Sequence, residues 1–342
     1  MSLTTTLALV QTVLTRYVLP ICLAFGFIGN LLNTIVFWQK HLRKNSCSVY
    51  FISTSVFNFL VLCFGMIPNL YSSYSSYDLA LYSIAYCKFR SYMVHVLLMI
   101  SRFSVALASI DRFALCSENV HIRSFSQHHR AMKAMFLACI LWILIPSHIL
   151  IFMNIYGQRC GANGTYLLIY SIYAAVVTII PLLIMVIFSS LAIQGLRQIH
   201  FRVRPNTATT NSTTHSTVQI KKRDKQFVVL LIGEVIIYVT STILFPLNTI
   251  YTVLTTSTPK NADRVAIEGF IRYLALSFLI YLNSCSIFYV HLISSHAFRH
   301  ECKRAFWRIY KPSRIIQTEL TAGSTSNVNV HHMIELHPME AQ

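Results

Sequence analysis

An acidic and a basic residue stand side by side at Asp111 and Arg112, 24 residues after Cys87. In a helix, those residues would span about 36 Å, enough to run from one membrane face to the other. An arginine at the inner end of such a helix can hold its neighbour's carboxylate in one state and be released in another. We therefore interpret the pair as a candidate latch; the alternative is an interfacial ion pair that reaches to lipid headgroups.

Two further charges lie deeper in apolar sequence. Arg102 precedes Arg112 by ten residues, about 15 Å along a helix, and Glu234 follows Lys225 by nine, about 13 Å. A charge at that depth costs at least ~2.5 kcal/mol on insertion scales, so each needs a partner or water. We expect a buried contact between Arg102 and Glu234, shared with His291, that favours the resting arrangement. Separate hydration of each charge is the alternative.

These charges are set in seven long apolar stretches separated by short polar connections. Each stretch meets or exceeds the ~20 residues that a helix needs to cross a ~30 Å hydrocarbon layer. The stretches are residues 17–38, 48–71, 84–116, 131–155, 166–193, 227–254 and 271–293. A hydrophobic fraction of 55% and a charged fraction of only 11% agree with this interpretation. The sequence predicts an all-α membrane protein with one bundle of seven transmembrane helices over residues 17–295.

Lysine and arginine gather after the first, third, fifth and seventh stretches, which hold most of the 28 such residues. The positive-inside rule makes that face cytoplasmic and places the N-terminal residues 1–16 outside, as expected for a plasma-membrane protein. Residues 1–16 lack a basic n-region, so we expect the first stretch to act as its own signal. The net charge of +17 follows from this topology, and no groove-reading motif accompanies it, so nucleic acid is not an expected partner.

Two of the nine cysteines fall on the predicted outer surface, where the compartment is oxidising. Cys87 begins the third stretch and Cys160 lies between the fourth and fifth. We expect a bridge that pins this loop across the mouth of the bundle; two unpaired thiols are the alternative. In the same loop, Asn163 begins an Asn-Gly-Thr sequon, which predicts glycosylation.

Asp111, Arg112 and Phe113 resemble the Asp-Arg-Tyr signature of rhodopsin-like G-protein-coupled receptors, and the overall pattern looks most like invertebrate neuropeptide receptors. In that family the released arginine meets the G protein, so the resemblance implies this role for Arg112. Further family positions are matched, in order and in the correct stretch, by Gly29, Asn30, Trp142, Pro181, Pro246, Asn283, Ser284 and Cys285. The spacing from these last three residues to Phe298 and Arg299 resembles that from the family's seventh helix into the short amphipathic helix after it.

The chain also departs from the family pattern. Asn58 stands where the second helix usually carries aspartate, so the sodium-binding carboxylate is missing. Phe245 precedes Pro246 without the usual tryptophan, and residues 287–291 lack both the proline and the tyrosine of the helix-seven motif. Polar side chains at mid-depth generally hydrogen-bond across a bundle, so we interpret three asparagines as structural network residues: Asn30, Asn58 and Asn283.

A cationic biogenic amine would lack its counterion, because Val94 occupies the place where amine receptors carry aspartate. The seventh stretch holds no lysine, which excludes a retinal Schiff base. The candidate pocket mixes aromatic area with a few hydrogen-bonding groups, which suits a short amidated or aromatic peptide; a small molecule is the other ligand class. Its residues are His95, Leu98, Met99, Tyr170, Tyr173, Asn248, Tyr251, Tyr273 and Tyr281. The tyrosines could instead form an interfacial belt.

Residues 296–311 predict a short amphipathic helix on the cytoplasmic face, with Cys302 as a candidate palmitoylation site. Residues 206–217 are almost all Thr, Ser and Asn and predict a disordered connection. The polar tail, residues 312–342, also predicts disorder and carries serines and threonines for receptor kinases. In the family that the sequence resembles, such clusters recruit arrestins.

A transporter or channel is the alternative from another class. The sequence shows no internal repeat, no pair of interrupted helices and no ring of acidic residues to favour it. An enzyme is not expected, because no metal-binding His/Glu cluster, P-loop or nucleophile elbow appears. No cofactor or metal is expected either.

Overall fold

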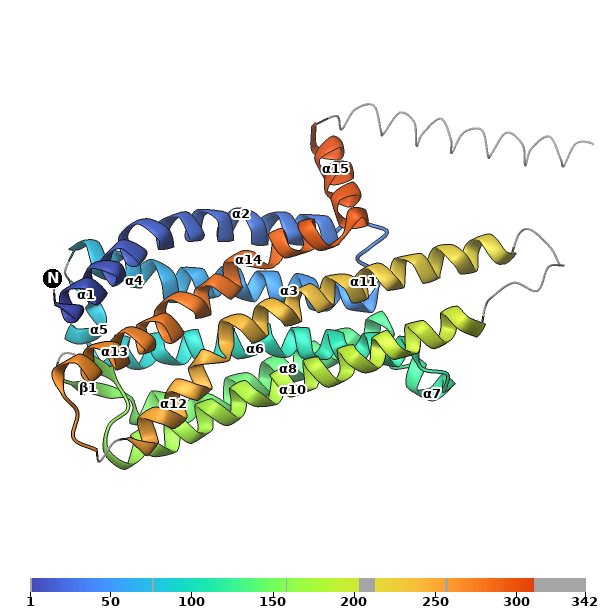
Figure 1. Ribbon diagram of the computed structural model, residues 1–342. Coiled ribbons are helices and arrows are strands. Elements are labelled where there is room, and N and C mark those ends of the chain that lie inside the picture. Colours follow the sequence, from blue (N-terminus) through green and yellow to red (C-terminus); the bar gives the residue numbers. More distant parts are fainter. Residues whose placement is uncertain (1, 76, 158, 203–212, 256–257, 311–342) are drawn as a thin grey trace, which may run out of the picture. The chain divides into compact units, whose positions relative to one another are not determined.

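The computed structural model of this protein describes residues 2–75, 77–157, 159–202, 213–255 and 258–310, except for the side chains of residues 197–225 and 308–310. Within these residues, seven helices are long and apolar enough to cross a membrane. They confirm the predicted seven-helix bundle, although the first helix already begins at Leu3. Figure 1 shows the helices side by side along a common direction.

Several spans consist of more than one helical segment. The first joins α1 (Leu3–Val13), the π-helical turn η1 (Leu14–Val18) and α2 (Leu19–Phe37); the second joins α3 (Ser46–Val61), η2 (Leu62–Met66) and α4 (Ile67–Ser75). The third is α6 (Ile84–Cys116), the fourth α8 (His128–Leu144) with η3 (Ile145–Ser147) and α9 (His148–Phe152), and the fifth α10 (Gly164–Arg202). The sixth is α11 (Thr213–Thr242) with α12 (Leu244–Leu254), and the seventh α13 (Ala262–Tyr273) with η4 (Leu274–Phe278) and α14 (Leu279–Ser294).

Helix six is divided at Ile243, three residues before Pro246. Proline lacks the N–H that would bond to the carbonyl four residues earlier, and its ring clashes with that carbonyl. The missing bond is the one to Thr242, which explains where α11 ends. Helix α10, in contrast, stays continuous through Pro181.

Helix α6 is central in the bundle. It packs against α3 and α10, while α14 packs against α2 and α11 (Figure 1). Large apolar side chains such as Phe136 and Leu144 of α8 are exposed. A soluble monomer rarely exposes so much apolar surface, whereas in a bilayer these groups meet lipid tails.

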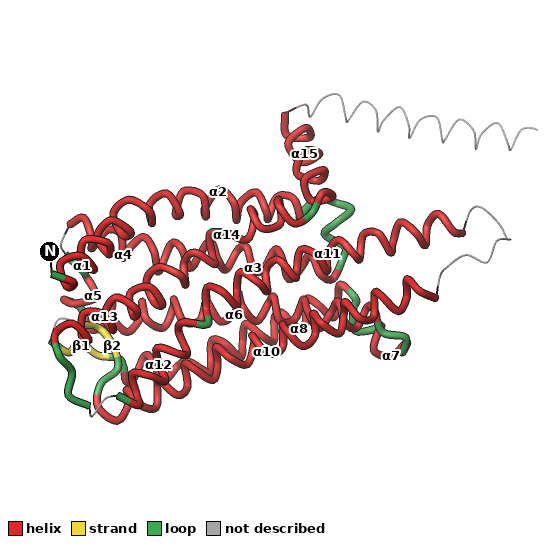
Figure 2. Tube along the Cα trace, in the orientation of Figure 1, coloured by secondary structure: helices red, strands yellow, loops and turns green. Residues whose placement is uncertain are grey.

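The predicted extracellular segments gather at one end of the bundle. Strands β1 (Asn154–Tyr156) and β2 (Arg159–Gly161) form an antiparallel hairpin with Ile155 opposite Cys160. Figure 2 shows this hairpin at the same end as α1, α5 (Leu79–Tyr82), α12 and α13, with α7 (Val120–Arg123) at the opposite end. The connections between the spans thus alternate between the two ends.

The chain from Ala297 on belongs to a second unit. Its described part belongs to helix α15 (His296–Tyr310), which confirms a helix after the seventh span. Helical spacing places Phe298 and Cys302 on one face and Arg299 and Lys303 on the other, as expected of an amphipathic helix. Residues 206–212 and the tail from residue 311 lie outside the described residues. Helix α11 begins at Thr213, inside the connection expected to be disordered.

Candidate functional site

The inner end of helix α6 holds Asp111 and Arg112 against the start of helix α3. Arg112 Nε donates to Asp111 Oδ2 at 3.0 Å, and Ser46 Oγ donates to the same oxygen at 2.9 Å. Asn45 caps α3 by accepting from the amide of Cys47, and its Oδ1 also accepts from Arg112 Nη2 at 3.2 Å. The start of the second span therefore holds both members of the candidate latch.

This pair is enclosed rather than exposed. Asp111 is 4% exposed and Arg112 1%, so the arginine does not reach lipid headgroups. Charge-assisted hydrogen bonds are strong in a low-dielectric interior, and an unpaired charge there is costly. In this structure Arg112 is thus held against Asp111.

A phenylalanine of helix six covers Arg112. The guanidinium carbon lies 5.4 Å from the centre of the Phe227 ring, a cation–π distance. Phe227 stacks on Phe37 and Phe51, with 6.3 and 6.1 Å between ring centres. His291 meets Phe51 at 5.2 Å. We refer to Phe37, Phe51, Phe227 and His291 as the inner aromatic cluster; it joins helices one, two, six and seven.

His291 gives this cluster a polar side. Its Nε2 lies 2.9 Å from Glu234 Oε1 of α11, and its Nδ1 lies 3.0 Å from Asn33 Oδ1 of α2. Asn33 Nδ2 donates to Ser55 Oγ of α3 at 2.6 Å. Because Asn33 Oδ1 accepts, His291 Nδ1 carries a proton, and Nε2 faces the Glu234 carboxylate.

Gly233 lets helices six and seven approach at this contact. A Cβ at Gly233 would lie 2.7 Å from Val290 Cγ1 and 3.0 Å from Ser294 Oγ. Both distances are shorter than ordinary van der Waals contact, so the absence of a side chain next to Glu234 is what permits the close packing.

Arg102 does not join this pair, which corrects the contact with Glu234 expected from the sequence. In the described part of the chain Arg102 forms no ion pair, and Glu234 lies against His291 instead. The Arg102 guanidinium carbon lies 5.4 Å from the centre of the Tyr238 ring. Tyr238 follows Glu234 by four residues, so the depth expected for helix six is wrong by about one helical turn.

The three mid-depth asparagines make different contacts. Asn30 Nδ2 donates to the carbonyl of Ser284 in helix seven at 2.9 Å. Asn58 Oδ1 accepts from Ser101 Oγ of α6 at 2.7 Å. The Asn283 side chain makes no hydrogen bond to another described residue. The predicted cross-bundle role thus agrees with the contacts of Asn30 and Asn58.

In the outer half, five side chains of helices three, four and five form a cluster. His95 Nε2 lies 3.0 Å from the hydroxyl of Tyr173, and the ring of Tyr170 lies 6.4 Å from that of His95. His148 packs edge-on against Tyr173 at 4.6 Å, and its Nδ1 lies 2.7 Å from the hydroxyl of Tyr166. We refer to these residues as the outer aromatic cluster. It contains three of the nine residues predicted for the ligand pocket.

The other six predicted pocket residues are not part of this cluster. Leu98 and Met99 are buried in α6, and Asn248 of α12 is partly exposed. The hydroxyls of Tyr281, Tyr273 and Tyr251 have separate partners, which are Asn69 Nδ2 at 3.3 Å, Thr15 Oγ1 at 2.8 Å and Glu268 Oε1 at 2.9 Å, respectively. These tyrosines tie helices and outer connections together, and among the described residues they make no ring contact or hydrogen bond with the outer aromatic cluster.

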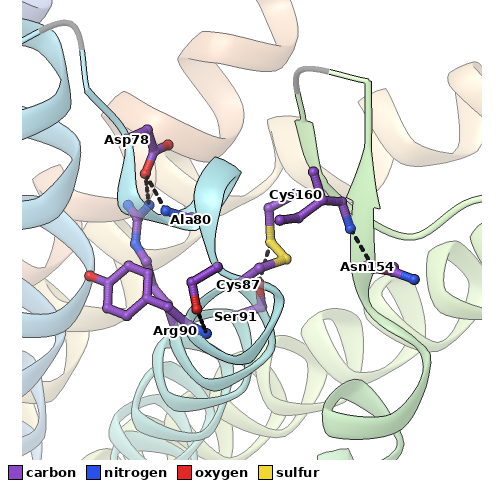
Figure 3. The surroundings of a disulfide bond; sticks show 10 residues. Asp78, Ala80, Cys87, Arg90, Ser91, Asn154 and Cys160 are labelled. Carbon is purple, nitrogen blue, oxygen red and sulfur yellow. Dashed lines mark hydrogen bonds and ion pairs between the residues drawn. A yellow bond between two sulfur atoms is a disulfide. The ribbon is translucent and has the colours of Figure 1, made fainter.

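Figure 3 shows the disulfide between Cys87, at the outer end of α6, and Cys160 of the hairpin. Their Cα atoms lie 5.7 Å apart, and the predicted bridge is confirmed. Next to it, Arg90 Nη1 lies 3.7 Å from Asp78 Oδ1, and Arg90 Nη2 donates to the side chain of Asn69. The bridge fixes the hairpin to the outer end of helix three.

Residues 29–286, well over half of the chain, match the sequence model of the family described as "7 transmembrane receptor (rhodopsin family)". The chain belongs to this family. It is also 23% identical over 161 residues to a mouse protein described as "Probable G-protein coupled receptor 34" (Mus musculus). That match covers 46% of the chain and 40% of the relative, so the chain spans well under half of the curated relative's length.

Membership confirms that the protein is a multi-pass membrane receptor and not an enzyme. The receptor departs from the family pattern where His291, with its Glu234 contact, replaces the tyrosine of the helix-seven motif. Phe113, in place of the tyrosine of the Asp-Arg-Tyr signature, packs edge-on against Phe188 at 5.4 Å. Both replacements are accommodated by packing inside the bundle.

Sequence reasoning missed several residues in and around the Asp111–Arg112 pair and the two clusters. Ser46 and Asn33 gave no separate signal, because single polar residues near helix ends are common. His148 could have been found as the one histidine of the fourth apolar stretch, residues 131–155, and Arg90 as a charge in the outer third of the third stretch. The exposed Asn163 precedes α10, and its glycosylation stays a prediction, as does palmitoylation of Cys302.

Proposed function

We propose that the receptor binds a short extracellular peptide, of the neuropeptide class, and activates a heterotrimeric G protein when Arg112 is released. The observation that carries this proposal is the double attachment of Arg112. Asp111 and Asn45 hold it from the side of helices two and three, and Phe227 covers it from helix six. Release therefore requires helix six to move, which is how a signal at the outer end could reach the inner rim.

The contact between Glu234 and His291 supports the same mechanism. Glu234 and Phe227 belong to one helix, and seven residues separate them, about two turns. Both face helices one, two and seven through the inner aromatic cluster. An outward movement of helix six would therefore break the ion pair and uncover Arg112 in one step.

The outer aromatic cluster supports a peptide with an aromatic or amidated end. His95, Tyr170 and Tyr173 offer ring faces with hydroxyl and imidazole groups, which bind aromatic rings and amides through packing and hydrogen bonds. Helix α10, which carries both tyrosines, packs against α12 of helix six. Ligand contact with α10 would thus shift the position of α12, the segment of helix six on the extracellular side of the break at Ile243.

The proposed orientation has the N-terminus outside and the C-terminus in the cytosol. The basic residues that cluster after the first, third, fifth and seventh spans support it. Receptor kinases would phosphorylate the serines and threonines of the tail, and arrestin would bind the product; these residues lie outside the described part of the chain.

A nucleotide-exchange assay tests the proposal. Membranes that contain the receptor are screened with a peptide library for ligand-dependent exchange on a G protein. An active peptide should lose exchange, but not binding, when Arg112 is replaced by Gln, while the exposed Arg123→Gln serves as the matched control. Solute flux without nucleotide exchange would instead support a transporter.

A further inference from the structure

The charges buried inside the bundle are not all paired. Besides Arg102, the buried charged side chains of the described residues are Asp111, Arg112, Glu234 and His291. Asp111 forms an ion pair with Arg112, and Glu234 lies 2.9 Å from His291, so both buried carboxylates already face another group. Arg102 is left with one positive charge in the middle of the bundle.

The surroundings of Arg102 compensate for this charge only in part. The residue is 4% exposed, and its buried Nε has no hydrogen-bond partner among the described residues. Tyr238 offers its ring face at 5.4 Å and a hydrogen bond to the Arg102 side chain, and its hydroxyl lies 3.4 Å from the carbonyl of Thr178. A cation–π contact offsets only part of the loss of hydration at this depth.

We propose that Arg102 is the centre of an anion site between helices three, five and six, and that it takes one small monovalent anion. One charge has to be neutralised, which favours a monovalent ion. The enclosed setting favours a compact ion that sheds water readily, of the halide class, over a large organic anion. Arg102 supplies the charge and the free Nε–H donor, and Tyr238 and Thr178 mark the neighbouring helices.

The same chemistry could come from an acidic group of the extracellular ligand. Arg102 lies 15 residues inward from Cys87, about 22 Å along helix three. An extended peptide would need about seven residues to cover that distance. A diffusible inorganic anion reaches this depth without such a length, and we therefore favour it as the source.

Bound anion would join helices three, five and six where they carry Arg102, Thr178 and Tyr238. Because it binds the folded receptor, it should stabilise the bundle in a concentration-dependent manner. This inference does not depend on the peptide or the G protein, and the test can therefore succeed or fail independently of the proposed function.

The test is a thermal melt of the purified full-length receptor in nanodiscs without added peptide. Sodium gluconate is exchanged for sodium chloride at constant ionic strength, and Tm should rise in a saturable way by about 5 °C. Arg102→Gln should melt higher than the wild type in gluconate and should show no response to chloride. Arg102→Lys should keep a response, and Arg272→Gln, a partly exposed arginine of α13, should respond like the wild type.

Formate and acetate distinguish the two sources. Stabilisation by chloride and bromide but not by formate or acetate assigns the site to an inorganic anion, whereas the reverse assigns it to the carboxylate of a ligand. Either result supports the site only if Arg102→Gln abolishes the stabilisation by the anion. Equal wild-type melting in gluconate and in every small anion overturns the proposal, as does an unchanged anion response in Arg102→Gln.

Discussion

Replacing His291 by Phe isolates the polar contact between helices six and seven. A phenylalanine ring keeps the packing against Phe37 and Phe51, whose ring centres lie 5.9 and 5.2 Å from that of His291. The variant leaves Glu234 without its partner, at side-chain exposures of 0% for His291 and 2% for Glu234. Removing one member of such a buried pair costs about 3–5 kcal/mol.

Part of that cost falls on the resting state alone, because we expect helix six to leave helix seven on activation. If only 1.4 kcal/mol or so is specific to the resting state, the ratio of active to resting receptor rises about tenfold. Basal nucleotide exchange by the His291→Phe receptor should increase accordingly, measured in membranes and normalised to surface expression. The exposed His129→Phe is the matched control and should leave basal exchange unchanged.

A double variant distinguishes the effect of the contact on basal exchange from its effect on the stability of the bundle. Replacement of a buried ion pair by apolar groups of similar volume is often neutral or stabilising. His291→Phe with Glu234→Leu should therefore recover the Tm that the single variant loses, yet keep the raised basal exchange, since the link between the helices is still absent. Basal exchange at the wild-type level in both the single and the double variant would refute the latch.

Three further outcomes follow from other contacts. Gly233→Ala puts a Cβ within 2.7 Å of a helix-seven side chain, which should raise basal exchange and lower Tm by a few degrees, at a cost of about 1–3 kcal/mol; Gly269→Ala, whose Cβ meets nothing within 4 Å, is the control. Removal of the disulfide by Cys87→Ser and Cys160→Ser should destabilise the receptor by about 2–5 kcal/mol, seen as a lower Tm; an equal Tm with and without reductant would contradict this. His95→Phe removes a hydrogen bond worth about 1 kcal/mol, so the potency of an active peptide should fall roughly fivefold while basal exchange stays constant.

The bundle and its bridge could be predicted from the sequence because they depend on signals that a single chain carries. Long apolar stretches require helices in hydrocarbon, since every backbone N–H and C=O must be paired within the segment. Cys87 and Cys160 could be paired because they fall on the same outer surface. The break before Pro246 follows from the chemistry of proline at one position.

The contacts between helices could not be predicted, because they depend on rotation and depth, which a sequence does not fix. Glu234 and Tyr238 lie on the same face of helix six, one turn apart, so a small difference in depth decides which of them meets Arg102. The residues predicted to line one pocket make separate contacts for a similar reason. Tyr273 points to Thr15 of the first helix, whereas Tyr173 points to His95.

The inner rim of this receptor depends on aromatic packing as much as on charge. The ion pair of Arg112 with Asp111 lies within one helix, and this pair alone would not restrain helix six. Phe227 supplies a restraint, because its ring covers the guanidinium and stacks on Phe37 and Phe51. A cation–π contact weakens steeply with separation and has no long-range electrostatic tail to re-form it. A modest displacement of helix six would therefore release Arg112 sharply, while Asp111 stays in place to receive it when the bundle closes.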